Sequence, residues 1–201
     1  MKILALELSS ARGSIALLSA GKVEFSRQWP NDRKNSGPFF EHLAEVQKQF
    51  GKSDTILVGL GPGSYAGTRI AISAATGLQV ASRARVIGYP SICSIECDTP
   101  EYWVIGDARR NSFFYARVCD HNLAEGPTLM AEAELRLKLG KLDRKMSIFT
   151  CEKLPQFERA ELRYPAAKML AQLATDQKRT FVQPPLEPMY LREPHITVPK
   201  K

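Results

Sequence analysis

Apolar residues fill three short segments at the start of the chain, and small polar residues separate them. The segments cover residues 2–8, Ser14–Ser19 and Val23–Gln28, which is the usual length of strands. Connections as short as those between them join antiparallel neighbours. The pattern therefore predicts a three-stranded antiparallel meander.

Two helices follow, and the spacing of apolar residues defines the first. In the segment Pro38–Phe50, large apolar side chains recur at i, i+4, i+7 and i+11, which is one face of a helix. Gly51 is a typical helix stop. A second apolar segment predicts a helix at about 69–83, between strands at 55–60 and Arg85–Gly88. The first half therefore has the order βββαβαβ.

The second half starts the alternation of strands and helices again, without a detectable sequence repeat. A boundary near 97–101 divides the chain into an amino-terminal lobe, 1–98, and a smaller carboxy-terminal lobe, 99–201. From Pro184 onward, prolines exclude regular structure and predict an extended tail. The other expected elements are strands at Tyr102–Asp107, Phe113–Cys119 and Met146–Thr150 and helices at Glu132–Leu139 and Ala166–Ala174.

A glycine-rich turn, Gly61 to Arg69, lies between the fourth strand and the second helix. Glycine permits positive φ angles, and Thr68 can cap the helix that follows. A helix that starts after such a turn presents free N–H groups, which suit a phosphate or a carboxylate. The alternative is a tight connector that packs the helix on the sheet. The turn is not a Walker loop, because no Lys-Ser or Lys-Thr pair follows its last glycine. The phosphate-binding candidates are Gly61, Gly63, Ser64, Gly67 and Thr68.

The composition is that of a soluble globular protein, and the net charge of +7 over 201 residues allows an acidic partner. No apolar stretch approaches the ~20 residues that span a bilayer, and the first residues lack the layout of a signal peptide. We therefore expect a cytoplasmic protein without membrane contact. The four cysteines have no metal or redox spacing and are expected to be reduced and mostly buried; they are Cys93, Cys97, Cys119 and Cys151.

The histidines form no metal-binding pair. Only His42, His121 and His195 are present, and none lies four residues from another, so no helix face offers two imidazoles to one metal. Ser64 has no evident His and Asp partners for a catalytic triad. The sequence therefore predicts no metal site and no catalytic residue, with His42 at the surface near Phe39 and His121 in solvent.

The glycine-rich turn also carries a resemblance. The stretch GPGSYAGTRIAISAATGLQ is similar to the GPGSFTGLRIG...A.GLA signature of the TsaB (YeaZ) family. Five further stretches resemble segments of that family in the same order along the chain. They are ILALELSSARGSIALL, VIGYPSICSIE, VIGDARRNSFFYARV, LRYPAAKMLAQLA and LEPMYLR.

The resemblance implies an α/β protein with two lobes of the ribonuclease-H-like, actin-like (ASKHA superfamily) fold. TsaB proteins are glycoprotease-like paralogues of the TsaD enzyme, which they hold and activate. The complex transfers a threonylcarbamoyl group to the adenosine beside the anticodon of tRNA, with the TsaE ATPase as a further partner. By resemblance, this chain is a bacterial accessory subunit and not an enzyme. The resemblance also implies that the chain forms a homodimer when alone and binds no cofactor by itself, and that ATP or ADP belongs to the partner complex.

Two positions depart from the family pattern. Glu7 stands where the family usually has Asp, and its extra methylene argues against a phosphate role. The favoured interpretation is a strand-end carboxylate bonded to N–H groups of the turn. Asn35 and Ser36 stand where many members have His-Ser, which removes a candidate acid/base.

Two groups of cations admit two interpretations each. Arg109 and Arg110 follow Asp107 at a hairpin tip, where a local ion pair is favoured over a phosphate contact to tRNA. A run of five cations further on is usually a solvated face, but with few acids nearby it is the better candidate for a tRNA-facing surface. These cations are Arg136, Lys138, Lys141, Arg144 and Lys145.

The partner is expected to dock on the two amino-terminal helices. Both sides of the 69–83 helix are apolar, although one apolar side is enough to bind a sheet. TsaB relatives cover such a second surface with TsaD or with a second copy of themselves. The expected sheet side is Ile70, Ala74, Gly77, Leu78 and Ala81, and the predicted interface residues are Phe39, Phe40, Leu43, Ile72, Thr76 and Val80.

Two enzymatic alternatives remain. A small ATP-dependent kinase of the same superfamily would use the turn Gly61–Gly67 to bind the phosphates of ATP. Glu7 and the short second lobe argue against this alternative. A metal-dependent peptidase is opposed by the missing histidine pair.

Overall fold

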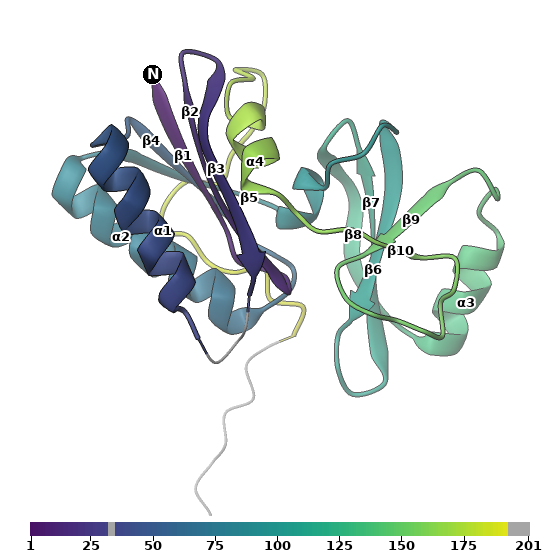
Figure 1. Ribbon diagram of the computed structural model, residues 1–201. Helices are drawn as coiled ribbons and strands as arrows, with labels where there is room; N and C mark the ends of the chain where they lie inside the picture. Colours follow the sequence, from purple (N-terminus) through teal and green to yellow (C-terminus); the bar gives the residue numbers. More distant parts are fainter. Residues whose placement is uncertain (32–34, 193–201) are drawn as a thin grey trace, which may run out of the picture.

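The computed structural model describes residues 1–31 and 35–192 (Figure 1). The first lobe is built on a five-stranded sheet in the order β3-β2-β1-β4-β5. Strands β1, β2 and β3 are antiparallel, which confirms the predicted meander, and β4 and β5 are parallel to β1. The strands are β1 (Lys2–Glu7), β2 (Arg12–Ser19), β3 (Lys22–Pro30), β4 (Thr55–Gly59) and β5 (Arg85–Tyr89).

Helices α1 (Gly37–Phe50) and α2 (Tyr65–Ser82) cover one face of this sheet (Figure 1). α1 buries Phe39, Leu43 and Val46, which confirms the predicted stripe. The helix stops at Gly51 as predicted, with a φ of 70°. Glycine suits this position because it has no Cβ to clash in the left-handed region.

Helix α2 differs from its prediction at its start and on its packing face. It begins at Tyr65, and its cap is Ser64, not Thr68: the Ser64 hydroxyl accepts the Gly67 N–H at 3.3 Å. Small residues, chiefly Ala71 and Ala75, face the sheet, so the helix lies close to the strands. The prediction of sheet contact through Ile70, Ala74, Gly77, Leu78 and Ala81 is therefore confirmed only in part. Ile70, Ala74 and Leu78 are half-buried and pack against the first lobe's core, whereas Gly77 and Ala81 are exposed.

The second lobe repeats the topology of the first. Its sheet has the order β10-β9-β6-β7-β8, with β6, β7 and β8 antiparallel and β9 and β10 parallel to β6. Both lobes are thus ribonuclease-H-like, and the predicted two-lobed α/β fold is confirmed. The elements are β6 (Glu101–Asp107), β7 (Ser112–Cys119), β8 (Asn122–Ala131), α3 (Glu132–Gly140), β9 (Ser147–Thr150) and β10 (Glu161–Leu162).

Strand β8 was absent from the sequence prediction because Gly126 and Pro127 interrupt its pattern. Proline cannot donate to a sheet ladder and is tolerated mainly on edge strands. β8 is the edge strand of its sheet, and its register with β7 shifts between Tyr115 and Val118. The edge position therefore reconciles the Gly-Pro pair with a strand.

The two lobes share one hydrophobic core. Helix α4 (Ala167–Leu173) and the 3-10 helix η1 (Ser91–Ser94) lie between the sheets and pack with buried residues of both, such as Leu57 and Val104 (Figure 1). α4 contacts β1, β2 and β4, although its place in the sequence assigns it to the second lobe. The boundary near residue 98 therefore separates the two sheets, while the chain returns to the first lobe with α4 and the segment after it.

Candidate functional sites

A cavity of about 590 Å³ lies between the two lobes. The first lobe contributes the β1–β2 turn and the glycine-rich turn, and the second lobe contributes the end of β6 and the turn that follows it. Residues 188–192 close one side, and Arg109, Arg110 and Arg192 are the cations of the lining. The volume lies within the ~300–1,000 Å³ of small-molecule sites.

The glycine-rich turn packs against the protein's own backbone. A Cβ on Gly63 would lie 2.1 Å from the Ser9 carbonyl oxygen, and one on Gly67 would lie 2.1 Å from that of Leu8. The Ser64 N–H donates to the Ser9 carbonyl at 2.6 Å. These contacts account for the glycines as a tight connector. Of the phosphate-binding candidates, the cavity lining includes Gly63, Ser64 and Thr68 but not Gly61 or Gly67.

Glu7 is fully buried at the end of β1. Its Oε1 accepts the Ser9 N–H at 2.6 Å, which confirms the predicted role of a strand-end carboxylate, while Oε2 has no partner among the described residues. Burial raises the pKa of Glu7, and hydrogen bonding by Ser9 opposes part of that rise. Because Glu7 does not line the cavity, it supports the turn from behind.

Three cations of the two groups form ion pairs. The Arg109 guanidinium lies 3.1 Å from the Asp107 carboxylate, which confirms the favoured local ion pair. In the run of five cations, Arg136 pairs with Glu132 at 2.7 Å and Lys138 with Glu125 at 2.8 Å. The expectation that this run faces few acids is therefore wrong for two of its members, which weakens it as a tRNA-facing surface.

The histidines and cysteines occupy structural positions. His42 lies at the surface, half-buried, with its ring 5.0 Å from that of Trp29. His121 is not solvated as predicted, because its Nδ1 lies 2.9 Å from the Cys93 carbonyl oxygen. His195 lies outside the described residues. All four cysteines are unpaired; Cys93 is buried and the others are half-buried. Within residues 1–31 and 35–192, no group of three or more His, Cys, Asp or Glu side chains is placed to hold a metal ion.

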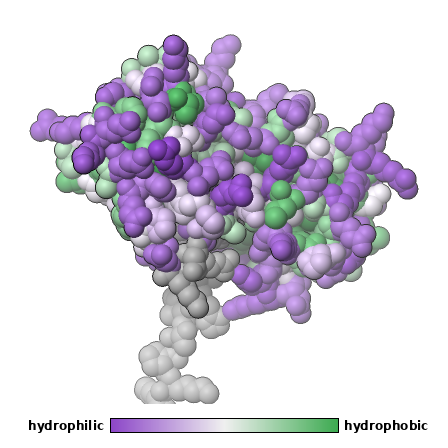
Figure 2. All heavy atoms as spheres, in the orientation of Figure 1, coloured by the Kyte–Doolittle hydropathy of each residue, from purple (hydrophilic) through white to green (hydrophobic). Residues whose placement is uncertain are grey.

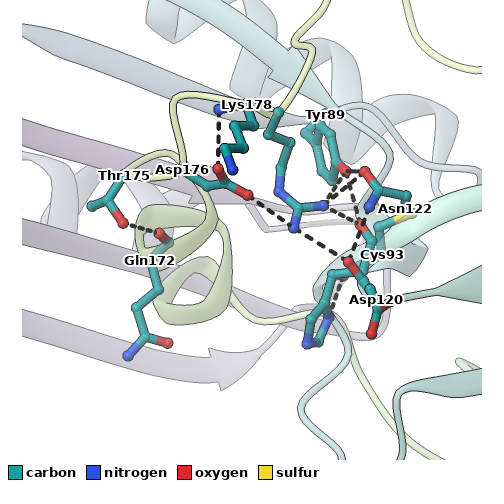
Figure 3. A network of polar contacts seen from close by, with 10 residues as sticks. Tyr89, Cys93, Asp120, Asn122, Gln172, Thr175, Asp176 and Lys178 are labelled. Carbon is teal, nitrogen blue, oxygen red and sulfur yellow. Dashed lines mark hydrogen bonds and ion pairs between the residues drawn. The ribbon is translucent and has the colours of Figure 1, made fainter.

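Arg179 fastens the second lobe to the first, and no signal in the sequence marks it. Figure 3 shows the network, in which its partners Tyr89, Asp120 and Asn122 are labelled. Its side chain is 9% exposed, and its guanidinium donates to the Tyr89 hydroxyl and the Asn122 carboxamide oxygen, each at 2.8 Å. It also donates to the main-chain carbonyls of Asp120 and His121, at 3.2 and 3.0 Å. Burial raises the pKa of Tyr89, and Arg179 opposes part of that rise. The network therefore fixes the β7–β8 turn against β5.

The outer surface of α1 and α2 leaves large apolar side chains in solvent. Phe40 is 49% exposed and Val80 is 82% exposed, Thr76 is exposed, and Ile72 is half-buried. Phe39 and Leu43, also predicted for the partner interface, are buried in the first lobe's own core, so that part of the prediction is wrong. In the view of Figure 2, hydrophobic residues form small separate patches on a largely hydrophilic surface.

Comparisons with known proteins agree with this architecture. A solved Pseudomonas aeruginosa protein, described as uncharacterised with similarity to peptidase YeaZ, superposes with a TM-score of 0.75 at 22% identity, over 95% of this chain and 99% of that one. The YeaZ protein of Pseudomonas aeruginosa gives a TM-score of 0.68 at 21% identity, over 94% and 99%. The chain has the YeaZ fold.

Comparison with curated sequences finds relatives that are also described as uncharacterised. Uncharacterised proteins of Mycobacterium bovis and Mycobacterium tuberculosis are 29% identical over 157 residues, which is 76% of this chain and 70% of theirs. No protein-family model matches the chain. None of the helices within the described residues is both long and apolar enough to cross a membrane.

Proposed function

We propose that this chain is a non-catalytic, TsaB-type subunit that binds and activates a TsaD-type catalytic subunit. The complex would transfer a threonylcarbamoyl group to the adenosine beside the tRNA anticodon, with a TsaE-type ATPase as a further partner. Two findings support the assignment: six stretches of family-like sequence in the right order, and the YeaZ fold along nearly the whole chain.

The observation that carries the proposal is the unpartnered outer surface of α1 and α2. From Ile70 to Ser82 the second helix contains no charged residue. A helix that packs on a sheet with one side normally presents charges on the other. Here the outward side carries Val80, 82% exposed, and the adjacent helix adds Phe40. Exposed apolar surface of this kind marks protein contact sites.

The occupant of this surface is proposed to be TsaD, or a second copy of this chain when TsaD is absent. Small residues such as Ser73 and Gly77 line the outer side of α2 and let another helix approach closely. Nothing within 4 Å would meet a Cβ added at Gly77, so this part of the helix offers space to a partner. ATP or ADP is assigned to the partner complex, and tRNA is proposed as the substrate of that complex.

A kinase role is less well supported. Kinases of this superfamily close two lobes around their ligand by a hinge motion. In this chain, α4 and η1 join both sheets in one core, and a large apolar interface opposes such motion. The glycine-rich turn, which would hold the phosphates, is packed against the carbonyls of Leu8 and Ser9.

Charge substitutions test the docking surface. Phe40→Glu and Val80→Glu should fold, since both side chains are exposed, and should weaken both the homodimer and the TsaD complex, followed by light scattering. Leu137→Glu is the matched control, because Leu137 is 70% exposed on α3 of the other lobe. Thermal melts confirm folding. Parent-like TsaD binding by both folded variants would place the interface elsewhere.

A cellular experiment tests the reaction. Depleting this protein should lower threonylcarbamoyladenosine in tRNA, measured by nucleoside mass spectrometry, and the parent gene should restore it. The Val80→Glu gene should restore less than the Leu137→Glu gene. Unchanged modification in a depleted strain with no second copy of the gene would overturn the assignment.

A further inference from the structure

The walls of the interlobe cavity differ in how firmly they are held. Those from the two lobes include core residues: Leu60, Ile105 and Phe114 are 2%, 0% and 5% exposed. Because the lobes share one core and are fastened by Arg179, these walls keep a fixed separation. Entry to the cavity by lobe motion is therefore opposed.

The remaining wall is residues 188–192. They end an extended segment, Val182 to Arg192, which we name the strap. Every strap residue is exposed or half-buried. After the bridge between Val182 and Gly88, its one backbone hydrogen bond within the described chain runs from the Met189 N–H to the Leu60 carbonyl at 2.8 Å. Its apolar contacts with the cores come from two half-buried leucines, Leu186 and Leu191. A segment with no fully buried residue lies at the low end of local stability.

Side chains hold the end of the strap to both lobes. The Tyr190 ring lies 5.4 Å from the Tyr65 ring at the start of α2, and these side chains are 42% and 48% exposed. Arg192 reaches the second lobe, with its guanidinium 3.5 Å from the Arg109 carbonyl oxygen. The strap thus bridges the two lobes at the cavity by contacts that solvent can reach.

We propose that the strap is the gate of the interlobe cavity, which opens by local release of residues 188–192 while the two lobes stay in place. The inference does not depend on the proposed function. It assigns control of access to the segment that carries the family-like stretch LEPMYLR.

A thiol inside the cavity reports the opening. Cys151 lines the cavity behind the strap, and N-ethylmaleimide alkylates it only when the reagent can enter. Met189→Pro removes the N–H that binds the Leu60 carbonyl, and Met189→Ala keeps it. Mass spectrometry of the Cys151 peptide should show roughly fivefold faster alkylation in the proline variant than in the alanine variant, the ratio that corresponds to one net hydrogen bond.

Two other cysteines are internal references. Cys119, half-buried outside the cavity lining, should react at the same rate in all variants, and the buried Cys93 should stay unreacted unless the chain unfolds. Tyr190→Ala loosens the strap from its exposed side and should also speed alkylation of Cys151, so the test stands if the proline variant unfolds. Equal Cys151 rates in parent and Tyr190→Ala, with Cys93 protected, would overturn the proposal.

Discussion

Glu7 and Asp107 occupy equivalent positions in the two lobes. Each ends the central strand of its sheet, and each carboxylate accepts the backbone N–H of the residue two positions further on, at 2.6 Å in both cases. Their surroundings differ: Glu7 is fully buried, whereas Asp107 is partly exposed and paired with Arg109. The duplicated fold thus retains one turn geometry with two electrostatic environments.

Two glycines of the same helix should respond to alanine in opposite directions. Gly67→Ala places a methyl group 2.1 Å from the Leu8 carbonyl oxygen, and this overpacking should cost about 1–3 kcal/mol of stability. Gly77→Ala meets no atom within 4 Å and should stabilise the helix by about 0.5–1 kcal/mol. Urea unfolding of both variants measures the difference. A stable Gly67→Ala protein would contradict the close packing of the turn on β1.

Glu7 should make stability depend on pH. Burial raises its pKa above the ordinary value of 4.5, so the folded chain favours the protonated carboxyl group. The resulting stabilisation is complete below pH 4.5 and is lost as the pH rises through the raised pKa. Glu7→Gln stays neutral and keeps an oxygen for the Ser9 N–H. Its free energy of unfolding relative to the parent should therefore be more favourable at about pH 8 than at about pH 5. An unchanged difference between the two conditions would contradict a buried, ionising Glu7.

Arg179 should contribute strongly to stability because its replacement leaves buried acceptors unpaired. Arg179→Ala should lower the free energy of unfolding by about 2–3 kcal/mol, as expected for hydrogen bonds to a charged group. Arg179→Lys should recover less than half, because one ammonium group cannot bond the Tyr89 hydroxyl, the Asn122 side chain and two carbonyls in the geometry of a guanidinium.

The matched control for Arg179 is an exposed ion pair. Arg163 is 51% exposed and lies 3.3 Å from Glu161, so Arg163→Ala should change stability by no more than about 1 kcal/mol. Denaturant unfolding compares the three variants. Equal losses for Arg179→Ala and Arg163→Ala would show that the junction between the lobes does not depend on the network.

Local patterns in the sequence predicted most of the elements. The stripe of α1, the antiparallel meander and the stop at Gly51 follow from residues within one segment, so periodicity and turn chemistry suffice to predict them. Strand β8 is not predicted from the sequence, because its edge position, which tolerates Gly126 and Pro127, is a property of the assembled sheet.

Only the tertiary structure shows the roles of the glycines, Arg179 and helix α4. Gly63 and Gly67 resemble a ligand-binding turn in the sequence, but carbonyl groups more than 50 residues earlier occupy the space beside them. Arg179 meets Tyr89 across a separation of 90 residues. The shared core exists because α4 returns to the first sheet from the far end of the chain. Such contacts depend on the packing of distant segments, and no local pattern of residue types encodes which segments will meet.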